Sequence, residues 1–291
     1  MASGSPFSGG RKAPGRRWPR AGLLLSLPLG LLSIPVVAEA QVHPSAGTDP
    51  AEVMAGVGLN MLAGGLTAGV TAAIRRGDVR EAFVMGAVGG GIAFAGKGVA
   101  AARFQGSGFL ARQLGAVGSS VVANAGSDRD WFEEVWIAAG PVWFQLRSEA
   151  PRRIRIDARD IVTATWLLVR AESRLDWERS LSHGTLFFTS PGYRIRTRGA
   201  MANGVAMSGL ILVGENPHGI DAVGGHEMIH VIQSDFMLHT WSRPLEGWAW
   251  GRITDGAPPV DLGVLPGALL RIGAFWDLLE REAQALDRLP R

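Results

Sequence analysis

Two long uncharged stretches dominate the first half of the chain. The segments Val53–Ile74 and Ala82–Gly96 contain no Asp, Glu, Lys or Arg, and a Gly-Asp pair between them is typical of a turn. Apolar runs of this length, separated by a turn, predict a helical hairpin. A third helix is expected over Gly108–Ala125, so that residues 52–127 form a helical region rich in Gly and Ala.

Glycines stand four residues apart in both runs, at Gly65 and Gly69 and again at Gly86 and Gly90. Small residues at this spacing let two helix backbones approach closely. The hairpin therefore either associates with a membrane through residues 53–102 or packs tightly inside a soluble domain. Asn and Thr side chains lower the hydropathy of the first run, and the second run is shorter than the ~20 residues that span a bilayer.

Beyond this region the pattern changes to short apolar runs interrupted by proline, which is typical of β-strands. After Gly214 the helical period returns, and a strongly helical segment covers Phe275–Leu286. The sequence predicts an α+β protein with a helical hairpin region, a mixed, β-rich middle and C-terminal helices, the last two forming one domain over residues 128–291. The expected strands are Val135–Ala138, Val142–Leu146, Arg153–Ile156, Ile161–Val169, Gly184–Thr189 and Ala206–Val213.

The first 40 residues have the features of a secretory signal peptide. A basic region ends at Arg20, an apolar stretch covers Ala21–Val37, and Ala38-Glu39-Ala40 fits the small-x-small cleavage pattern. Residues 41–51 are interpreted as a short linker. We therefore expect an exported protein of the bacterial periplasm or cell envelope. The alternative is an uncleaved membrane anchor, which the two prolines in the apolar stretch disfavour.

Composition removes several classes of function. The chain of 291 residues contains no cysteine, which excludes a disulfide scaffold, an iron–sulfur centre and a zinc finger. Its formal net charge is +3, with 29 basic and 26 acidic residues, but five of the basic residues and one acid lie in residues 1–40. The remainder carries 24 basic and 25 acidic residues. Because no positive excess remains, we expect no nucleic-acid partner.

The candidate chemistry lies in the segment Gly225-His226-Glu227-Met228-Ile229-His230, which matches H-E-x-x-H. On a helix, His226 and His230 lie one turn apart on the same face, so both imidazoles can bind a single Zn²⁺ ion. Glu227 lies about 100° further around the helix axis, where it can act as a general base without being a ligand. Neutral imidazoles leave the charge of the ion intact and thus keep it a Lewis acid.

The context of the motif predicts how it is mounted. Gly209–Val213 is expected to be a strand, and Asp221 is expected to cap a helix that begins near Ala222. Catalytic zinc usually has three protein ligands, so one more is needed. The metzincin extension is absent because Gln233 and Phe236 stand where that pattern requires glycine and histidine. His239 is a weak candidate, and the C-terminal helix offers better ones.

His226, Glu227 and His230, followed on a later helix by Glu280 and Ala283, resemble the gluzincin branch of the zincin metallopeptidases. The resemblance covers about residues 209–286 and is closest to integral-membrane and exported bacterial peptidases, whose later helix carries E-x-x-A-D. It implies that Glu280 is the third metal ligand. Gln284 stands where the family has an Asp that braces a ligand, and Glu282, nearer the apolar stripe of the helix, is a rival for the ligand position.

Taken together, the sequence predicts a zinc metallopeptidase of the bacterial cell envelope, a hydrolase that acts on a peptide or protein substrate. One zinc ion is expected on His226, His230 and Glu280, with Glu227 as the catalytic base. The strand before the motif helix is one that pairs with extended substrate in zincins. The alternative function is a non-catalytic envelope or membrane-associated structural protein whose metal site is structural or vestigial.

Overall fold

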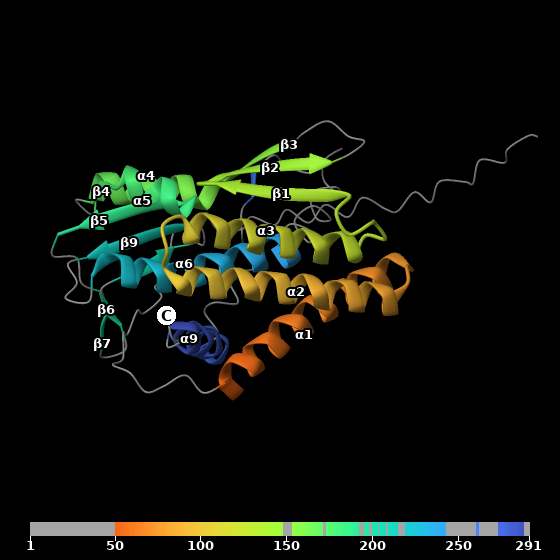
Figure 1. Ribbon diagram of the computed structural model, residues 1–291. Helices are drawn as coiled ribbons and strands as arrows, with labels where there is room; N and C mark the ends of the chain where they lie inside the picture. Colours follow the sequence, from red (N-terminus) through yellow and green to blue (C-terminus); the bar gives the residue numbers. More distant parts are fainter. Residues whose placement is uncertain are drawn as a thin grey trace, which may run out of the picture. The chain divides into compact units, whose positions relative to one another are not determined.

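The computed structural model describes residues 50–147, 153–170, 173–191, 195–197, 200–202, 204–207, 209–214, 219–242, 260–261 and 273–287. The expected signal peptide and all but the last two residues of the expected linker lie outside these ranges. The chain is an α+β protein, as predicted (Figure 1). Its helices are α1 (Pro50–Arg75), α2 (Val79–Ala102), α3 (Ser107–Ala125), α4 (Ala158–Arg170), α5 (Trp177–His183), α6 (Ile220–Met237) with a π-helical extension η2 (Leu238–Ser242), and α9 (Gly273–Asp287).

The three predicted N-terminal helices are confirmed as α1, α2 and α3. The carboxylate of Asp78 caps α2 by accepting hydrogen bonds from the backbone amides of Arg80 and Glu81 at 2.9 and 3.0 Å. Helices α1 and α2 contact each other at glycine residues. A Cβ atom on Gly90 would overlap the carbonyl oxygen of Asn60. The backbones of α1 and α2 are therefore as close as glycine allows.

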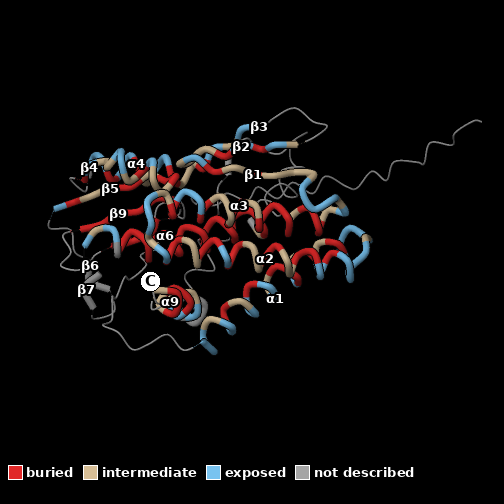
Figure 2. Tube along the Cα trace, viewed as in Figure 1, coloured by how far each residue is buried: buried red, intermediate tan, exposed pale blue. Residues whose placement is uncertain are grey.

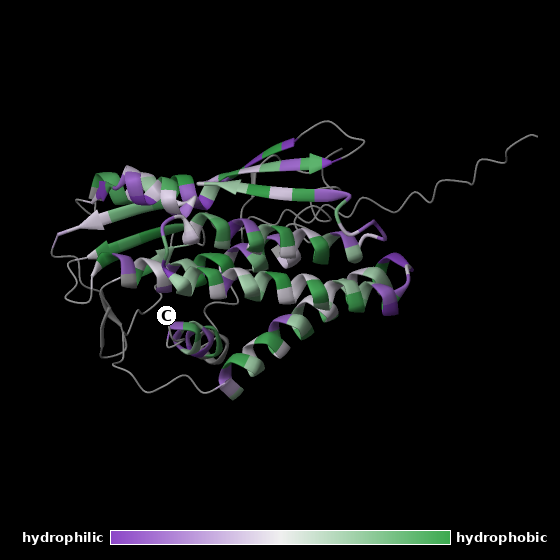
Figure 3. Cartoon of the chain, viewed as in Figure 1, coloured by the Kyte–Doolittle hydropathy of each residue, from purple (hydrophilic) through white to green (hydrophobic). Residues whose placement is uncertain are grey.

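Helix α1 has its small residues inside and its large apolar residues outside. Its buried positions are Gly, Ala and one Asn, whereas Leu62, Leu66, Val70 and Ile74 are 49 to 77% exposed (Figures 2 and 3). This arrangement is the reverse of that in a helix whose apolar side chains form a soluble core. By length and composition, α1 and α2 are both able to cross a membrane.

The strands form two four-stranded sheets and a hairpin. The first sheet has the order β1 (Glu134–Ala139), β2 (Val142–Arg147), β3 (Arg153–Asp157) and β10 (Val260–Asp261), and β1 contacts α3. The second has the order β4 (Arg174–Leu175), β5 (Leu186–Ser190), β9 (Leu210–Gly214) and β8 (Gly204–Met207). β6 (Ile195–Thr197) and β7 (Ala200–Ala202) make the hairpin. The single strand expected over Ala206–Val213 is therefore two antiparallel strands, β8 and β9.

The expected strand Ile161–Val169 is wrong, because this segment belongs to helix α4. Its β-branched residues favour a strand locally. The buried positions, however, are Asp160, Ala164 and Leu167, which recur every three or four residues as on a helix. The carboxylate of Asp160 also accepts a hydrogen bond from the backbone amide of Gly209 at 2.9 Å. Tertiary burial of one helical face thus overrides the local preference.

Helix α6, which carries the H-E-x-x-H motif, lies at the centre of the molecule (Figure 2). Every residue from Val223 to Thr240 is buried. The helix contacts α2 and α3 on one side, β8 and β9 on another, and α9 on a third. Helix α9 in turn contacts α1 and α2. The motif is therefore enclosed by elements from both halves of the chain.

The glycine contacts between α1 and α2 can be tested with two alanine substitutions in α2. Gly90→Ala is expected to lower the free energy of unfolding by about 1–3 kcal/mol, because the added methyl group overlaps the backbone of α1. Gly98→Ala is the matched control, since nothing lies within 4 Å of its added Cβ. The control should gain about 0.5–1 kcal/mol, because alanine is the better helix former. Equal effects in denaturant titrations would contradict the close approach.

Candidate metal centre

The helix that carries the motif begins two residues earlier than the sequence predicts. It starts at Ile220, and its N-cap is Gly219, whose φ of 89° lies in the left-handed region that favours glycine. Asp221 is therefore not the cap. It lies in the first turn, where its exposed carboxylate accepts a hydrogen bond from the Arg179 side chain at 2.9 Å. The Asp221 side chain is therefore bound by Arg179 of α5, and it does not cap the backbone amides of α6.

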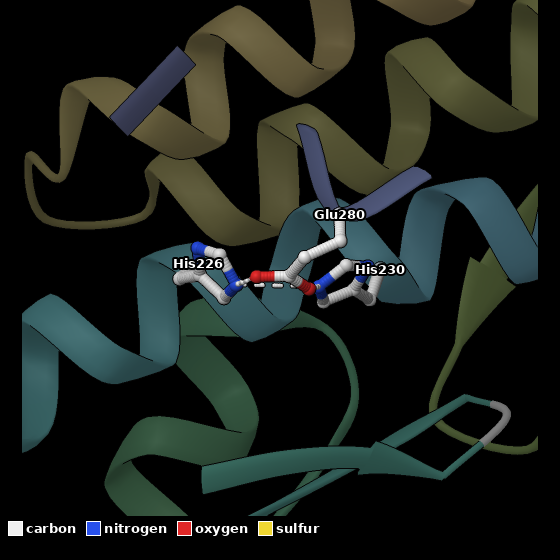
Figure 4. A group of neighbouring side chains, drawn as sticks. All are labelled: His226, His230 and Glu280. Carbon is white, nitrogen blue, oxygen red and sulfur yellow. Dashed lines mark hydrogen bonds and ion pairs between the residues drawn. The ribbon is translucent and has the colours of Figure 1, made fainter. Parts of the chain in front are cut away.

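His226 and His230 face the same side of α6, as the i, i+4 spacing predicts. Their Nε2 atoms lie 3.2 Å apart, and both side chains are buried. Glu280 reaches them from α9 (Figure 4). One of its oxygens lies 3.1 Å from Nε2 of His230, and the other lies 3.6 Å from Nε2 of His226. The three side chains expected to bind the metal are thus brought together, with one donor atom of each within 4.8 Å of the others.

The hydrogen-bond partners of the Nδ1 atoms determine the tautomer of each imidazole. Nδ1 of His226 lies 2.9 Å from a carboxylate oxygen of Asp287, and Nδ1 of His230 lies 2.8 Å from Oε1 of Gln233. The amide nitrogen of Gln233 donates to the carbonyl oxygen of Leu279 and to Glu282, which fixes its orientation. Both partners of the Nδ1 atoms are acceptors, so each Nδ1 carries a proton. The two neutral rings therefore direct Nε2 lone pairs at each other and at Glu280.

This convergence of lone pairs suits a metal ion. Two imidazole nitrogens and a carboxylate repel one another unless a cation lies between them. With zinc–ligand distances of 2.0–2.1 Å, the edges of a ligand tetrahedron measure about 3.3–3.4 Å. The two Nε2 atoms, 3.2 Å apart, match such an edge. The contacts of 3.1 and 3.6 Å are made by the two different oxygens of Glu280, so both oxygens of the carboxylate face the imidazoles. The residues present therefore fit zinc in donor type, and one donor atom of each lies within 4.8 Å of the others.

Each of the three side chains expected to bind the metal also has an outer partner, but the Asp expected from the resemblance is replaced. Gln284, at the family's Asp position, donates a hydrogen bond to Glu280 at 2.9 Å. The carboxylate that contacts His226 comes instead from Asp287, which Arg103 holds at 2.6 Å. Sequence reasoning missed Asp287, although positions 280, 284 and 287 share one face of α9 by their spacing.

Glu282, the rival for the ligand position, points into a different set of contacts. Its carboxylate lies 2.6 Å from Nζ of Lys97 and accepts hydrogen bonds from Asn60 and Gln233. Glu282 is therefore buried on the apolar side of α9 because it forms this ion pair. Of the two acids, Glu280 is the one that faces the imidazoles.

Glu227, the expected base, is completely buried. Within the described part of the chain its carboxylate oxygens make no close hydrogen bond, and the backbone amide of Ala206 on β8 is a weaker donor to them. Burial is the main reason why its pKa rises from 4.5 to about 7, against the attraction of His226 and His230 and the interaction with Ala206. Strand β8 passes close by, since a Cβ atom on Gly204 would lie 3.1 Å from Oε1 of Glu227. A buried carboxylate without a close hydrogen bond is costly and indicates a functional role.

The charges around His226 favour a cation at this position. Burial alone would lower the pKa of His226, but hydrogen bonds to Asp287 and Glu280 outweigh it and raise the pKa well above its ordinary value. Burial likewise opposes ionisation of Glu280, and the two histidines overcome it, which lowers the pKa of the Glu280 carboxyl. Asp287 behaves in the same way beside His226 and Arg103. In the metal-free protein, an additional proton therefore takes the place of the metal.

Two other expectations have a clear structural outcome. His239 lies in η2, and its ring packs edge-on against Trp143 with centroids 3.9 Å apart, so it belongs to the core and not to the cluster. The strand before α6, β9, is paired on both sides, parallel to β5 and antiparallel to β8. Within the described strands, the edge of this sheet next to the motif helix is β8.

No protein-family model, no curated protein and no solved structure matches this chain. The site is therefore interpreted from its own geometry.

The pKa shifts predict how the stability of the metal-free protein depends on pH. Raised pKa values let folded His226 and Glu227 hold protons that the unfolded chain has released. The free energy of unfolding should therefore fall as the pH rises from about 5 to 8. The lowered pKa values of Glu280 and Asp287 act only in more acidic solution, near the unfolded values of 4.5 and 3.8.

Zinc should reverse this trend because it replaces the protons. The increase in melting temperature on adding zinc is expected to grow between about pH 5 and pH 8. Thermal unfolding of the same protein with and without zinc measures both effects. A zinc-induced increase that is the same at every pH would contradict the proposed exchange of protons for metal.

Proposed function

We propose that this chain is a zinc-dependent peptidase. The observation that carries the proposal is the Glu227 carboxylate, on the residue next to His226, which is buried and makes no close hydrogen bond among the described residues. A metal site that only holds two helices together has no use for such a group. A hydrolase requires a base at this position.

In this proposal His226 and His230 on α6 and Glu280 on α9 hold a single zinc ion. Bound zinc supplies Lewis acidity, which polarises a substrate carbonyl and lowers the pKa of water. Asp287 and Gln233 keep the Nδ1 protons in place and thereby keep Nε2 of each ring available for the ion. Two neutral ligands and one carboxylate leave a net positive charge at the site.

Glu227 is the general base and afterwards the general acid. Its pKa of about 7 suits proton transfer in both directions near neutral pH. The carboxylate takes a proton from the attacking water and later delivers it to the amine that leaves.

The alternative is a structural zinc site in a non-catalytic protein of the envelope. The cluster does join α6 to α9, as such a site would. Structural zinc sites, however, are usually closed by four protein ligands. The cluster found among the described residues has three, and Glu227 adds a base beside it. These two features favour hydrolysis.

The substrate in this proposal is a peptide or an unfolded protein segment. An extended segment could add to the edge of β8, because β9 has no free edge. Gly204 lies on β8 beside Glu227, so its missing side chain lets the strand approach the base. A segment bound there would run beside α6 and Glu227.

We further propose that the protein works at the membrane of the bacterial envelope. Helix α1 has 26 residues, about 39 Å in length, and its mean hydropathy reaches 1.5 in an 18-residue window. Its outward face carries Leu62, Leu66 and Val70. Small residues at the helix contact and large apolar residues outside are typical of helices that face lipid. The expected signal peptide agrees with this location.

Glu227→Gln is the sharpest test of catalysis. Gln has the same shape but cannot take up a proton, so hydrolysis should fall by at least about 10²-fold. Zinc content should remain at one ion per chain, because Glu227 is not a ligand. His230→Ala and Glu280→Ala are the comparison variants and should lose zinc as well as activity. Peptide cleavage and metal analysis of the same samples measure both, and an active Glu227→Gln enzyme would disprove the mechanism.

Membrane association can be tested on the outward face of α1. The double variant Leu66→Lys/Val70→Lys should move the protein from the membrane to the soluble fraction, since each charge at bilayer depth costs about 2.5–3.5 kcal/mol. Val162→Lys/Val169→Lys on α4 is the control, because these residues are comparably exposed. If both variants sediment with membranes as the wild type does, lipid does not contact this face.

A further inference from the structure

Two cationic side chains at α2 contact acids on α9. One of these acids, Asp287, contacts His226 directly, and the other, Glu282, is connected to His230 through Gln233. Lys97 contacts Glu282, and Arg103, at the C-terminal cap of the helix, contacts Asp287, each at 2.6 Å. Lys97 is the only charged residue of α2 between Glu81 and that cap. Neither cation has a place in the proposed catalytic steps, so the hydrogen bonds that continue from them need an explanation.

The Lys97 branch leads to His230. Nζ of Lys97 donates to Glu282 and, at 2.8 Å, to the side-chain oxygen of Asn60 on α1. Glu282 accepts a hydrogen bond from Gln233 at 2.7 Å, and Gln233 accepts the Nδ1 proton of His230 at 2.8 Å. All five side chains are buried. An unbroken chain of hydrogen bonds thus runs from the hairpin to the metal-facing ring.

The Arg103 branch leads to His226 and is shorter. Arg103 donates to one oxygen of Asp287, and the other oxygen lies 2.9 Å from Nδ1 of His226. Arg103 adopts a left-handed backbone with φ of 55°, at a helix end where glycine is the usual residue. An arginine at this position bears the cost of the left-handed conformation, and its guanidinium reaches Asp287 from there.

We propose that Lys97 and Arg103 are positioning residues of the metal centre: through Glu282 and Gln233, and through Asp287, they orient His230 and His226 and hold α9 where Glu280 meets them. The inference rests on the proposed zinc site but not on peptide hydrolysis. A buried ion pair such as Lys97–Glu282 adds little stability over apolar residues of similar size. Its value lies in the orientation it imposes on the ligands.

Two double variants separate positioning by Lys97 from simple stabilisation. Lys97→Met/Glu282→Met removes the ion pair without leaving a buried charge, so the protein should fold. Gln233 then loses its partner on α9, and zinc affinity should fall about 10- to 100-fold. Lys97→Met/Glu282→Gln keeps an acceptor for Gln233 and should bind zinc as the wild type does.

Arg103→Gly tests the other branch. Glycine suits the left-handed backbone, but Asp287 is left mostly buried without its cation, so the melting temperature of the metal-free protein should decrease somewhat. Zinc affinity should fall as well, because Asp287 loses its partner. The control is Arg112→Met/Asp235→Met, which removes a pair about as buried as Lys97–Glu282, 2.8 Å long, between α3 and α6. Arg112 also donates to two backbone carbonyls, so this control should lose stability while zinc affinity stays unchanged.

The measurements are zinc affinity of the full-length chain by chelator competition, the Co²⁺ absorption spectrum as a report on ligand geometry, and melting temperature. Wild-type affinity in Lys97→Met/Glu282→Met and in Arg103→Gly would overturn the proposal. An equal loss of zinc affinity in Lys97→Met/Glu282→Met and in Lys97→Met/Glu282→Gln would also overturn it. A wild type that binds zinc but cleaves no peptide refutes the peptidase alone, whereas one that binds no zinc refutes both.

Discussion

Three lone-pair donors meet in the interior of this protein, and much of the structure around them serves to keep them there. Two neutral imidazoles and a carboxylate would separate in water. Here α6 is buried from Val223 onward and contacts α9, which holds Glu280 beside His226 and His230. A cation makes this arrangement favourable, either a metal ion or the proton that His226 holds because Asp287 and Glu280 raise its pKa.

The contacts between the two hairpin helices are part of the same organisation. Gly90 on α2 lies directly against the backbone of Asn60 on α1, and a larger residue would force the helices apart. Asn60 is the residue of α1 that completes the pair formed by Lys97 and Glu282. Close packing of the hairpin therefore brings the partners of the inner hydrogen-bond chain within reach. The small residues of the two uncharged runs therefore contribute to the geometry around the His226, His230 and Glu280 cluster, far along the chain.

Local sequence patterns were sufficient for the features that depend on local spacing. The i, i+4 histidines face one side of a helix, and the uncharged runs are helices, because helical periodicity decides both. Glu280 was expected only through the resemblance to gluzincins, and the structure brings it to the two rings. The pattern failed at α4, where β-branched residues face outward and burial of the opposite face decides the conformation.

The outer partners of the histidines could not be predicted, because no local pattern pairs Lys97 with Glu282 or Arg103 with Asp287. Those pairs depend on how α2 and α9 come together in three dimensions. Glu282 shows the difficulty most clearly, since its place on the apolar side of α9 was compatible with a ligand and with a buried ion pair. Only the position of Lys97 distinguishes the two.

The polar residues of the hairpin also connect this pair of apolar, outward-facing helices to the proposed metal site. In lipid, an unpaired Lys or Asn costs several kcal/mol, so such residues turn toward protein partners. Asn60 and Lys97 do so, and the partners they meet are those that support the metal ligands. The hairpin therefore has two different faces. Large apolar side chains lie on its outer face, and small or polar side chains lie on the inner face that contacts the rest of the protein. If α1 were removed, Glu282 would lose its contact with Asn60, and the loss would reach His230 through Gln233.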